Sequence, residues 1–505
     1  MYKMTQKFAA AAIAIAAVAL AQYAAAATIT VNSIADVSAA DGACTLREAL
    51  QAANTNLAVN GDCVAGQAAP TVDLIAFAIP GSGPHVITPT GYMGAINETL
   101  TIDGMTQPGA VANSATPAQG GLNGTIVIEI SGVNCAGCNF PIGLGLTSGE
   151  ATFRGLAISH FPAPINLASA SPATIRIEGC HIGTDVNGLT ATGAQNAIGF
   201  NSGVWSIGGT TPAKRNLIVA ASSAIWTQSA ASITVQGNLI GTTRDGLAPL
   251  PMSGDAIHLR LLPGGSAQIG GSDTSARNVI GSAGGYGLHL IGFGADGSAF
   301  RVEGNHIGVG ADGVAPVPNL TGGVRWGTNS PVVNGWPIIG NGNLIAWNAG
   351  PAVVVAGGTN AVTEVVGNSM HDNGLGIDLD ENGRTPNDPA DADSGSNLRM
   401  NHPEFDRYDW SNGQYALRYR VDTALANAAY PLRVDFYLAA DVDDAEGMQW
   451  LGSDTIDVGD AQQWRDFSLP GPQGHALVAT TTDALGRSSE FSGPDRLFAD
   501  SFELP

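Results

Sequence analysis

A short pattern of apolar and polar residues recurs through the middle of the chain. Each copy places a β-branched residue two positions before a glycine and follows that glycine with a polar residue in most copies. An apolar residue comes near the end, and a second glycine follows it in three of the four copies. The four copies lie at residues 177–183, 235–241, 302–308 and, in weaker form, 365–370, so the pattern returns every 58 to 67 residues. A second motif lies between them, at residues 207–218, 269–280 and, shortened, 339–345.

The spacing inside each copy predicts a turn between two short strands. Val302 and Ile307 are five positions apart, so a straight strand would point them to opposite faces. Gly304 and Asn305 lie between them, and this dipeptide allows the chain to turn. Short β-branched strands separated by such turns at regular intervals predict a solenoid, in which each turn is one rung of a stack.

The repeat length suggests how many rungs each repeat contains. About 62 residues divide into about three rungs of roughly 20 residues. With three strands in each rung, the all-β fold is a right-handed parallel β-helix. In such a stack the turn asparagines can bond to one another as a ladder; alternatively, they are there only because asparagine favours turns. The residues concerned are Asn216, Asn238, Asn278, Asn305, Asn343 and Asn368.

Distinct segments flank the β-helix, which we assign to residues 100–377. Residues 28–99 form an N-terminal cap, with a strand at 28–31 and a short amphipathic helix whose apolar face is formed by Leu46, Ala49, Leu50 and Ala53. Residues 378–403 are an acidic linker. Residues 404–492 alternate apolar and polar positions, which predicts a β-sandwich-like domain. Residues 493–505 form a C-terminal tail.

The N-terminus and the charge indicate where the protein works. Residues 1–27 combine Lys3 and Lys7 with an apolar run and small residues at the end, as in a secretory signal peptide. No later stretch reaches the roughly 20 apolar residues that a transmembrane helix needs. The formal net charge is −22, and −24 without those two lysines. Such an acidic chain repels phosphate backbones, so we expect no nucleic-acid partner. Simple electrostatic attraction to polyuronates or anionic lipid is not expected either, unless a divalent cation reverses the charge locally.

Five cysteines in an exported chain raise the question of disulfides. Cys44 and Cys63 are predicted to close a short loop. Cys135 and Cys138 form a C-x-x-C motif, which indicates a small local disulfide or, alternatively, a redox pair, although no βαβ context surrounds it. Cys180 occupies the asparagine position of its repeat, so we expect a buried free thiol.

Residues 44–49, Cys-Thr-Leu-Arg-Glu-Ala, resemble the C-S-L-R-E-A element that begins a large group of secreted bacterial β-helix proteins, with Thr45 in place of serine. The resemblance continues through residues 126–132, 374–379 and 481–492. It implies a pectate-lyase-like β-helix followed by a small β domain, and an extracellular or cell-surface location in a Gram-negative-type bacterium. It implies no particular reaction. Residues 497–503 look like a C-terminal tail of exported Gram-negative proteins.

The acidic linker is a candidate calcium site. It contains Asp-x-Asp-x-Asn-Gly, which matches the first half of a calcium-binding loop. Pro389 stands where an EF-hand has glutamate, so an EF-hand is excluded. The alternative is a solvated acidic linker. The candidate ligands are Asp378, Asp380, Asn382, Asp388, Asp391 and Asp393.

Three residues are candidates for catalysis. If Ile257 and Leu259 point inward, His258 and Arg260 point outward together, and His289 does the same on its own strand. A polysaccharide lyase needs a base and a group that neutralises the uronate carboxylate. The alternative is an ordinary exposed polar face. Asp245 and Asp312, which a hydrolase would need to face one another, fit turn chemistry better.

These features predict an exported binding or adhesion protein that recognises glycans or surface partners without catalysis. A polysaccharide-active enzyme, a lyase or hydrolase using the outward residues, is the alternative. A spacer without a specific ligand is also compatible with the sequence. The fold alone does not decide among them.

Overall fold

The structure is a computed structural model that describes residues 26–135, 137–144, 149–167, 173–293, 300–330, 335–440 and 445–493. Almost all of the predicted signal peptide (1–27) and of the predicted tail (493–505) lies outside these ranges. Within them, no helix has both the length and the apolar character that crossing a membrane requires.

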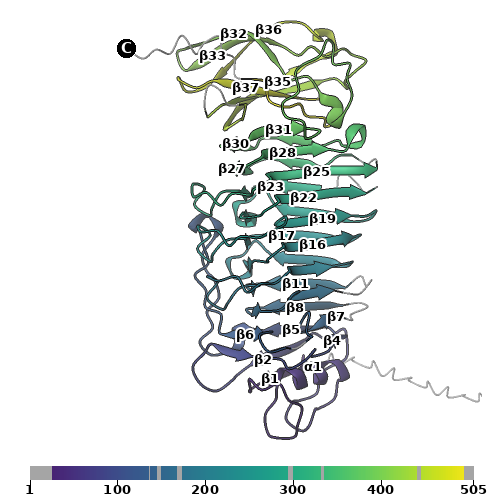
Figure 1. The fold of residues 1–505 in the computed structure, drawn as a ribbon, viewed down its shortest axis with the longest axis vertical. Coiled ribbons are helices and arrows are strands. Elements are labelled where there is room, and N and C mark those ends of the chain that lie inside the picture. Colours follow the sequence, from purple (N-terminus) through teal and green to yellow (C-terminus); the bar gives the residue numbers. More distant parts are fainter. Residues whose placement is uncertain are drawn as a thin grey trace, which may run out of the picture.

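Three long parallel sheets run along the long axis of the molecule, and the strands of each sheet stack in that direction (Figure 1). We call them sheets I, II and III, in the order in which the chain visits them. Sheet I comprises β1 (Thr28–Val31), β2 (Asp73–Phe77), β5 (Leu100–Asp103), β8 (Glu150–Arg154), β11 (Thr174–Glu178), β14 (Val204–Gly208), β17 (Ser232–Gln236), β20 (Ser266–Gly270), β23 (Phe300–Glu303), β26 (Ile338–Gly340) and β29 (Glu364–Val366).

Sheets II and III complete the solenoid. Sheet II comprises β3 (His85–Ile87), β6 (Ile128–Ser131), β9 (Ala157–Ser159), β12 (His181–Ile182), β15 (Leu217–Ile218), β18 (Leu239–Ile240), β21 (Val279–Ile280), β24 (His306–Ile307), β27 (Leu344–Ala346) and β30 (Ser369–His371). Sheet III comprises β10 (Ile165–Leu167), β13 (Asn196–Phe200), β16 (Ser223–Ser229), β19 (Ile257–Leu261), β22 (Tyr286–Phe293), β25 (Gly322–Ser330), β28 (Pro351–Ala356) and β31 (Leu375–Leu379).

Shorter elements complete the connections. β4 (Ala95–Ile96) pairs with β7 (Gly143–Leu144). Single turns of 3-10 helix occur at Gly104–Thr106, Pro117–Gln119, Pro212–Lys214, Thr274–Ala276, Gly358–Asn360, Ser396–Arg399 and Val458–Asp460.

From β8 onward each rung contributes one strand to each sheet, which confirms the predicted all-β parallel solenoid. The predicted number of rungs per repeat is wrong. From β11 to β17 the chain completes two rungs, not three, and from β11 onward the strands of sheet I begin 26 to 38 residues apart. Loops and 3-10 turns lengthen the rungs. The second sequence motif is therefore the same structural position in the alternate rungs.

The core lies between the three sheets, and its rows are aligned from rung to rung. Strand pairing places Ile177, Ile207, Val235, Ile269 and Val302 opposite one another in sheet I. Each is at most 1 % exposed. Burying such a side chain contributes about 1.5–3 kcal/mol, so a continuous row stabilises every rung through its neighbours.

The turn asparagines form the ladder that the sequence left open as one of two interpretations. The side chains of Asn216, Asn238, Asn278, Asn305, Asn343 and Asn368 are buried, and the Nδ2 of each of the first five donates to the Oδ1 of the next asparagine at 2.8–3.1 Å. At the lower end of the ladder, the backbone N–H of Cys180 donates to Oδ1 of Asn216 at 2.8 Å. Cys180 is the buried free thiol that we predicted, and burial raises its pKa to about 12.

A second ladder, which the sequence analysis missed, lies at a different turn. Nδ2 of Asn319 donates to Asn348, and Nδ2 of Asn348 donates to Asn373, each at 2.8 Å. Nδ2 of Asn373 then donates to Oε1 of Glu446 at 2.7 Å. This ladder therefore leads from the solenoid into the C-terminal region.

A helix covers the first rungs (Figure 1). Helix α1 (Leu46–Thr55) lies where the sequence predicts one, with its apolar face buried. A capping box between Thr45 and Glu48 begins the helix. The disulfide between Cys44 and Cys63 closes the adjoining loop, and Cys135 and Cys138 are also bonded, which confirms both predicted disulfides.

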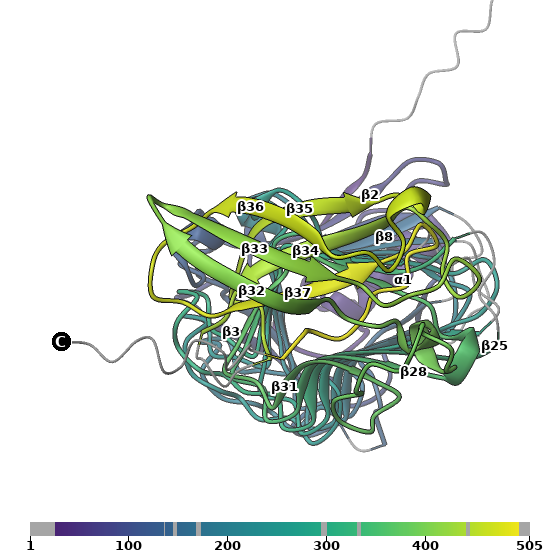
Figure 2. The same ribbon diagram turned by 90° about the horizontal axis from the view of Figure 1, so that it is seen from above.

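Two antiparallel sheets lie over the last rung (Figure 2). Their shared core includes Tyr419, Phe436 and Leu477. One sheet orders β32 (Glu404–Ser411), β33 (Gln414–Arg420) and β36 (Arg465–Pro470), and the other orders β35 (Gln449–Ile456), β34 (Leu432–Leu438) and β37 (Leu477–Thr482).

The C-terminal region satisfies backbone groups at the end of the solenoid. The N–H of Met370 donates to the carbonyl of Gly447 at 2.9 Å. The N–H of Leu379 donates to Oε1 of Glu490 at 2.8 Å. The last rung is thereby covered, which protects an edge that could otherwise pair with another chain.

We expect Asn278→Ala to lower the free energy of unfolding by about 2–4 kcal/mol, because it leaves buried partners unsatisfied on both neighbouring rungs. The exposed Asn201→Ala is the control and should change the free energy of unfolding by less than about 0.5 kcal/mol. Urea denaturation of both variants checks this. Equal losses would contradict a special role for the ladder.

Candidate functional site

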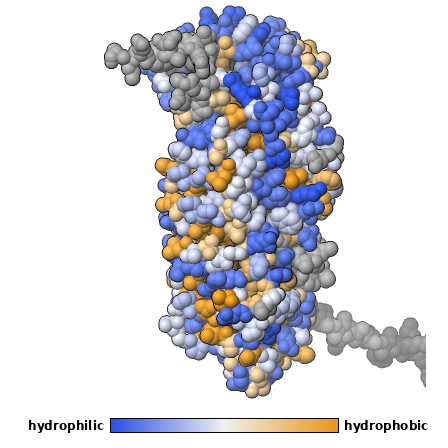
Figure 3. Space-filling model, in the orientation of Figure 1, coloured by the Kyte–Doolittle hydropathy of each residue, from blue (hydrophilic) through white to orange (hydrophobic). Residues whose placement is uncertain are grey.

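The outer face of sheet III carries the candidate catalytic residues. In β19, Ile257, Leu259 and Leu261 are fully buried, whereas His258 and Arg260 are partly exposed. This is the alternation expected of a strand with one face in the core. Figure 3 shows hydrophilic side chains gathered over this part of the solenoid, with single hydrophobic groups between them.

Strand pairing turns outward side chains on successive rungs into a row. Trp226 of β16 lies opposite His258 of β19, His258 opposite His289 of β22, and His289 opposite Arg325 of β25. Neighbouring strands are about 4.8 Å apart, so these four residues span about 14 Å along the long axis of the molecule.

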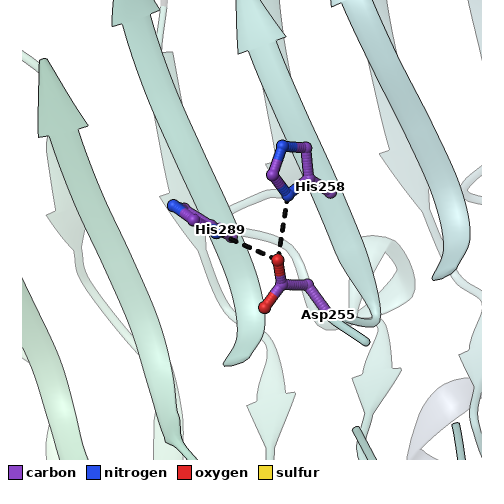
Figure 4. A group of neighbouring side chains, drawn as sticks. All are labelled: Asp255, His258 and His289. Carbon is purple, nitrogen blue, oxygen red and sulfur yellow. Dashed lines mark hydrogen bonds and ion pairs between the residues drawn. The ribbon is translucent and has the colours of Figure 1, made fainter. Parts of the chain in front are cut away.

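A carboxylate joins the two histidines (Figure 4). Asp255 lies in the turn before β19, and its Oδ2 is 2.9 Å from Nδ1 of His258 and 2.9 Å from Nδ1 of His289. Its Oδ1 accepts a hydrogen bond from the N–H of Tyr286 at 2.8 Å. Burial alone would raise the pKa of Asp255, but the hydrogen bonds from the two histidines and from Tyr286 hold it well below its ordinary value. The carboxylate is therefore ionised at neutral pH.

Arg325 determines the tautomer of His289. Its Nη1 is 3.1 Å from Nε2 of His289, and a guanidinium can only donate, so Nε2 accepts. The proton of neutral His289 then lies on Nδ1, where it is donated to Asp255. Arg325 also pairs with Glu381 through Nε at 2.7 Å, and the hydroxyl of Tyr286 donates to the same carboxylate at 3.2 Å. Nε2 of His258 points away from Asp255 (Figure 4).

Arg260 provides a positive charge on the same face. It lies two residues after His258, and its guanidinium carbon is 5.0 Å from the centroid of the Phe293 ring. No ion pair joins Arg260 to another residue that the structure describes, and its Nε is buried without a hydrogen-bond partner. In a chain of net charge −22, this cation is available to an anionic group.

The structure thus brings the three candidate catalytic residues onto one face, and it joins His258 to His289 through Asp255. The sequence places Asp255 in the same short cluster as His258 and Arg260, but we predicted no role for it, and we did not predict Tyr286, Arg325 or Glu381 as site residues. The sequence could have indicated Arg325 in the same way as His289. It stands between the apolar residues Val324 and Trp326, and this alternation predicts that its side chain points outward. Glu381 lies more than 50 residues from Arg325 and gave no such signal.

The six candidate calcium ligands divide into separate groups. Oxygens of Asp388, Asp391 and Asp393 lie within 4.8 Å of one another. Asp378 instead accepts hydrogen bonds from the N–H groups of Asn382 and Gly383. Asp380 pairs with Arg399 at 2.8 Å. Burial and the neighbouring Asp388 and Asp393 raise the pKa of Asp391 to about 7.

The repeat histidines and turn aspartates have structural surroundings. His181 and His306 are buried, with Nδ1 close to a backbone carbonyl, and burial lowers the pKa of each to about 4. Asp245 accepts from the N–H of Leu247, and Asp312 accepts from two such groups in its turn. These contacts agree with the expected turn chemistry.

Two cations, two imidazoles and an ionised carboxylate therefore lie beside the aromatic residues Trp226 and Phe293 on one partly exposed face. Such a set can bind an anionic or hydroxyl-rich ligand and can move a proton at Nε2 of His258. The chain matches no protein-family model, and it matches no curated protein.

Proposed function

We propose that this is an exported protein of the cell surface or extracellular space that binds glycans or surface partners along the outer face of sheet III. The observation that carries the proposal is the row from Trp226 to Arg325, with Arg260 beside it. We further infer that the solenoid is a right-handed β-helix and that the two C-terminal sheets form a sandwich-like accessory module. The predicted signal peptide and the two disulfides support export.

The chemistry of the row favours polysaccharides that contain uronates. Aromatic rings such as Trp226 offer an apolar surface with a polar edge, onto which the C–H face of a sugar can pack. Arg260, which forms no ion pair with a described residue, can hold a carboxylate through two parallel hydrogen bonds. Because the remainder of the protein is acidic, Arg260 concentrates the attraction for such a group at this face.

A polysaccharide-active enzyme is the second candidate, and one specific observation favours it. His258 and Arg260 converge on one face instead of lying on separate faces. Asp255 orients His258 so that its Nε2, which bonds to no residue within the described ranges, can accept a proton. A lyase requires such a base together with a cation for the uronate carboxylate. Hydrolysis is less well supported, because the nearby carboxylates of Asp255 and Glu381 already pair with histidine and arginine.

We expect the protein to bind uronate oligosaccharides in isothermal titration calorimetry, and Arg260→Gln to weaken binding about tenfold or more, since charge-assisted hydrogen bonds contribute about 1.5–3 kcal/mol. Trp226→Ala should also weaken it. Arg418→Gln is a matched control, because Arg418 also lies over an aromatic ring, that of Trp464, but in the C-terminal region.

The same mixtures distinguish the two candidates. Binding without unsaturated products supports a binding protein, whereas products that disappear in His258→Gln support the lyase. If the wild-type protein binds no uronate or neutral glycan, or if Arg418→Gln weakens binding as much as Arg260→Gln, the proposed binding face is wrong.

The proposal includes one calcium ion at Asp388, Asp391 and Asp393, where it would stabilise the junction between the solenoid and the C-terminal sheets. We expect calcium to raise the thermal unfolding midpoint at pH 8. At pH 5 the increase should be smaller, because a proton then occupies Asp391, whose pKa lies near 7. Asp391→Asn should remove the increase and Asp378→Asn should retain it. Equal increases in all three proteins would rule this site out.

A further inference from the structure

We infer that Asp255, His258 and His289 form a site for one divalent transition-metal ion of the Zn²⁺ class. Oδ2 of Asp255 and one ring nitrogen from each histidine lie within 4.8 Å of one another. The three residues come from two adjacent rungs and the turn before one of them (Figure 4). The inference does not depend on glycan binding.

The donor set selects the class of metal. Imidazole nitrogens suit zinc, copper, iron and nickel, whereas Ca²⁺ takes oxygen ligands. This site therefore differs in kind from the three aspartates at the junction. Two imidazoles and one carboxylate leave at least one coordination position for water or a ligand, as in catalytic zinc sites.

The geometry is close to what such an ion needs. Each Nδ1 is 2.9 Å from Oδ2, and zinc bonds of about 2.0–2.2 Å in a tetrahedral site require slightly larger separations between ligand atoms. Each Nδ1 therefore has to move away from Oδ2 by about a few tenths of an ångström, and the two ring nitrogens, which lie within 4.8 Å of each other, have to reach a similar separation. The side chains are 24 %, 19 % and 15 % exposed for His258, His289 and Asp255, so an ion can reach them from solvent.

Of the surrounding hydrogen bonds, one favours metal binding and another disfavours it. The N–H of Tyr286 holds Oδ1 of Asp255, which orients the carboxylate. An ion at Nδ1 of His289 displaces its proton, so the neutral ring must then carry a proton on Nε2. Arg325 can no longer donate to that atom, although it keeps Glu381 as its partner. Arg325 is therefore a positioning residue that favours the empty site.

The test uses tag-free protein in excess Ca²⁺, which occupies oxygen-only sites. Titration with Co²⁺ should give visible absorption bands that saturate at one ion per chain and disappear when Zn²⁺ is added. We expect Asp255→Asn and His289→Gln to lower Co²⁺ affinity at least tenfold. Even mutation of a residue that only hydrogen-bonds to a metal ligand typically lowers metal affinity by about 10- to 100-fold. His371→Gln is the matched control, because it removes another histidine that contacts an aspartate.

Arg325→Gln provides a test in which the variant is expected to bind the metal more tightly, not more weakly. A glutamine oxygen can accept the proton on Nε2 of His289, so this variant should bind Co²⁺ more tightly than the wild-type protein. If neither protein gives Co²⁺ bands, or if His289→Gln binds as well as the wild-type protein, the metal site is refuted. Metal binding in a protein that binds no glycan would leave this site standing and refute only the proposed glycan function.

Discussion

The buried asparagine ladder is the constraint on which the rest of the structure depends. An amide enclosed in an apolar core has to find hydrogen-bond partners, and here the partners lie on the neighbouring rungs. Each rung must therefore lie at the position and in the register that allow its asparagine side chain to form a hydrogen bond with the asparagine of the next rung. The ladder aligns the diverged sequence copies in a regular stack, and it ends at Cys180, whose backbone N–H donates to Oδ1 of Asn216.

Regular stacking also creates the candidate site. His258, His289 and Arg325 are more than 30 residues apart from one another in the chain. The register of the paired strands nevertheless places them directly opposite one another, in one row. A slip of one residue in any strand would turn its outward side chain into the core. The chemistry on sheet III is thus a consequence of register, and the buried rows beneath it hold that register in place.

The periodic features were the ones that sequence could predict. Alternation in residues 257–261, the Gly-Asn turns and the face of helix α1 each depend on neighbours in the chain, and they revealed the solenoid, the cap and the outward direction of His258. The number of rungs per repeat was predicted wrongly, because loops such as the one around Pro212–Lys214 lengthen a rung without altering its motif. The meeting of Asp255 with His289 and of Arg325 with Glu381 depends on contacts between rungs, for which one sequence holds no local signal.

A crystal structure of the protein with a bound uronate oligosaccharide would show directly whether glycans bind to sheet III. We expect sugar density along the outer face of sheet III, with a ring against Trp226 and a carboxylate within hydrogen-bond distance of Arg260. Sugar density confined to the C-terminal sheets or to the opposite side of the solenoid, with sheet III bare, would contradict it.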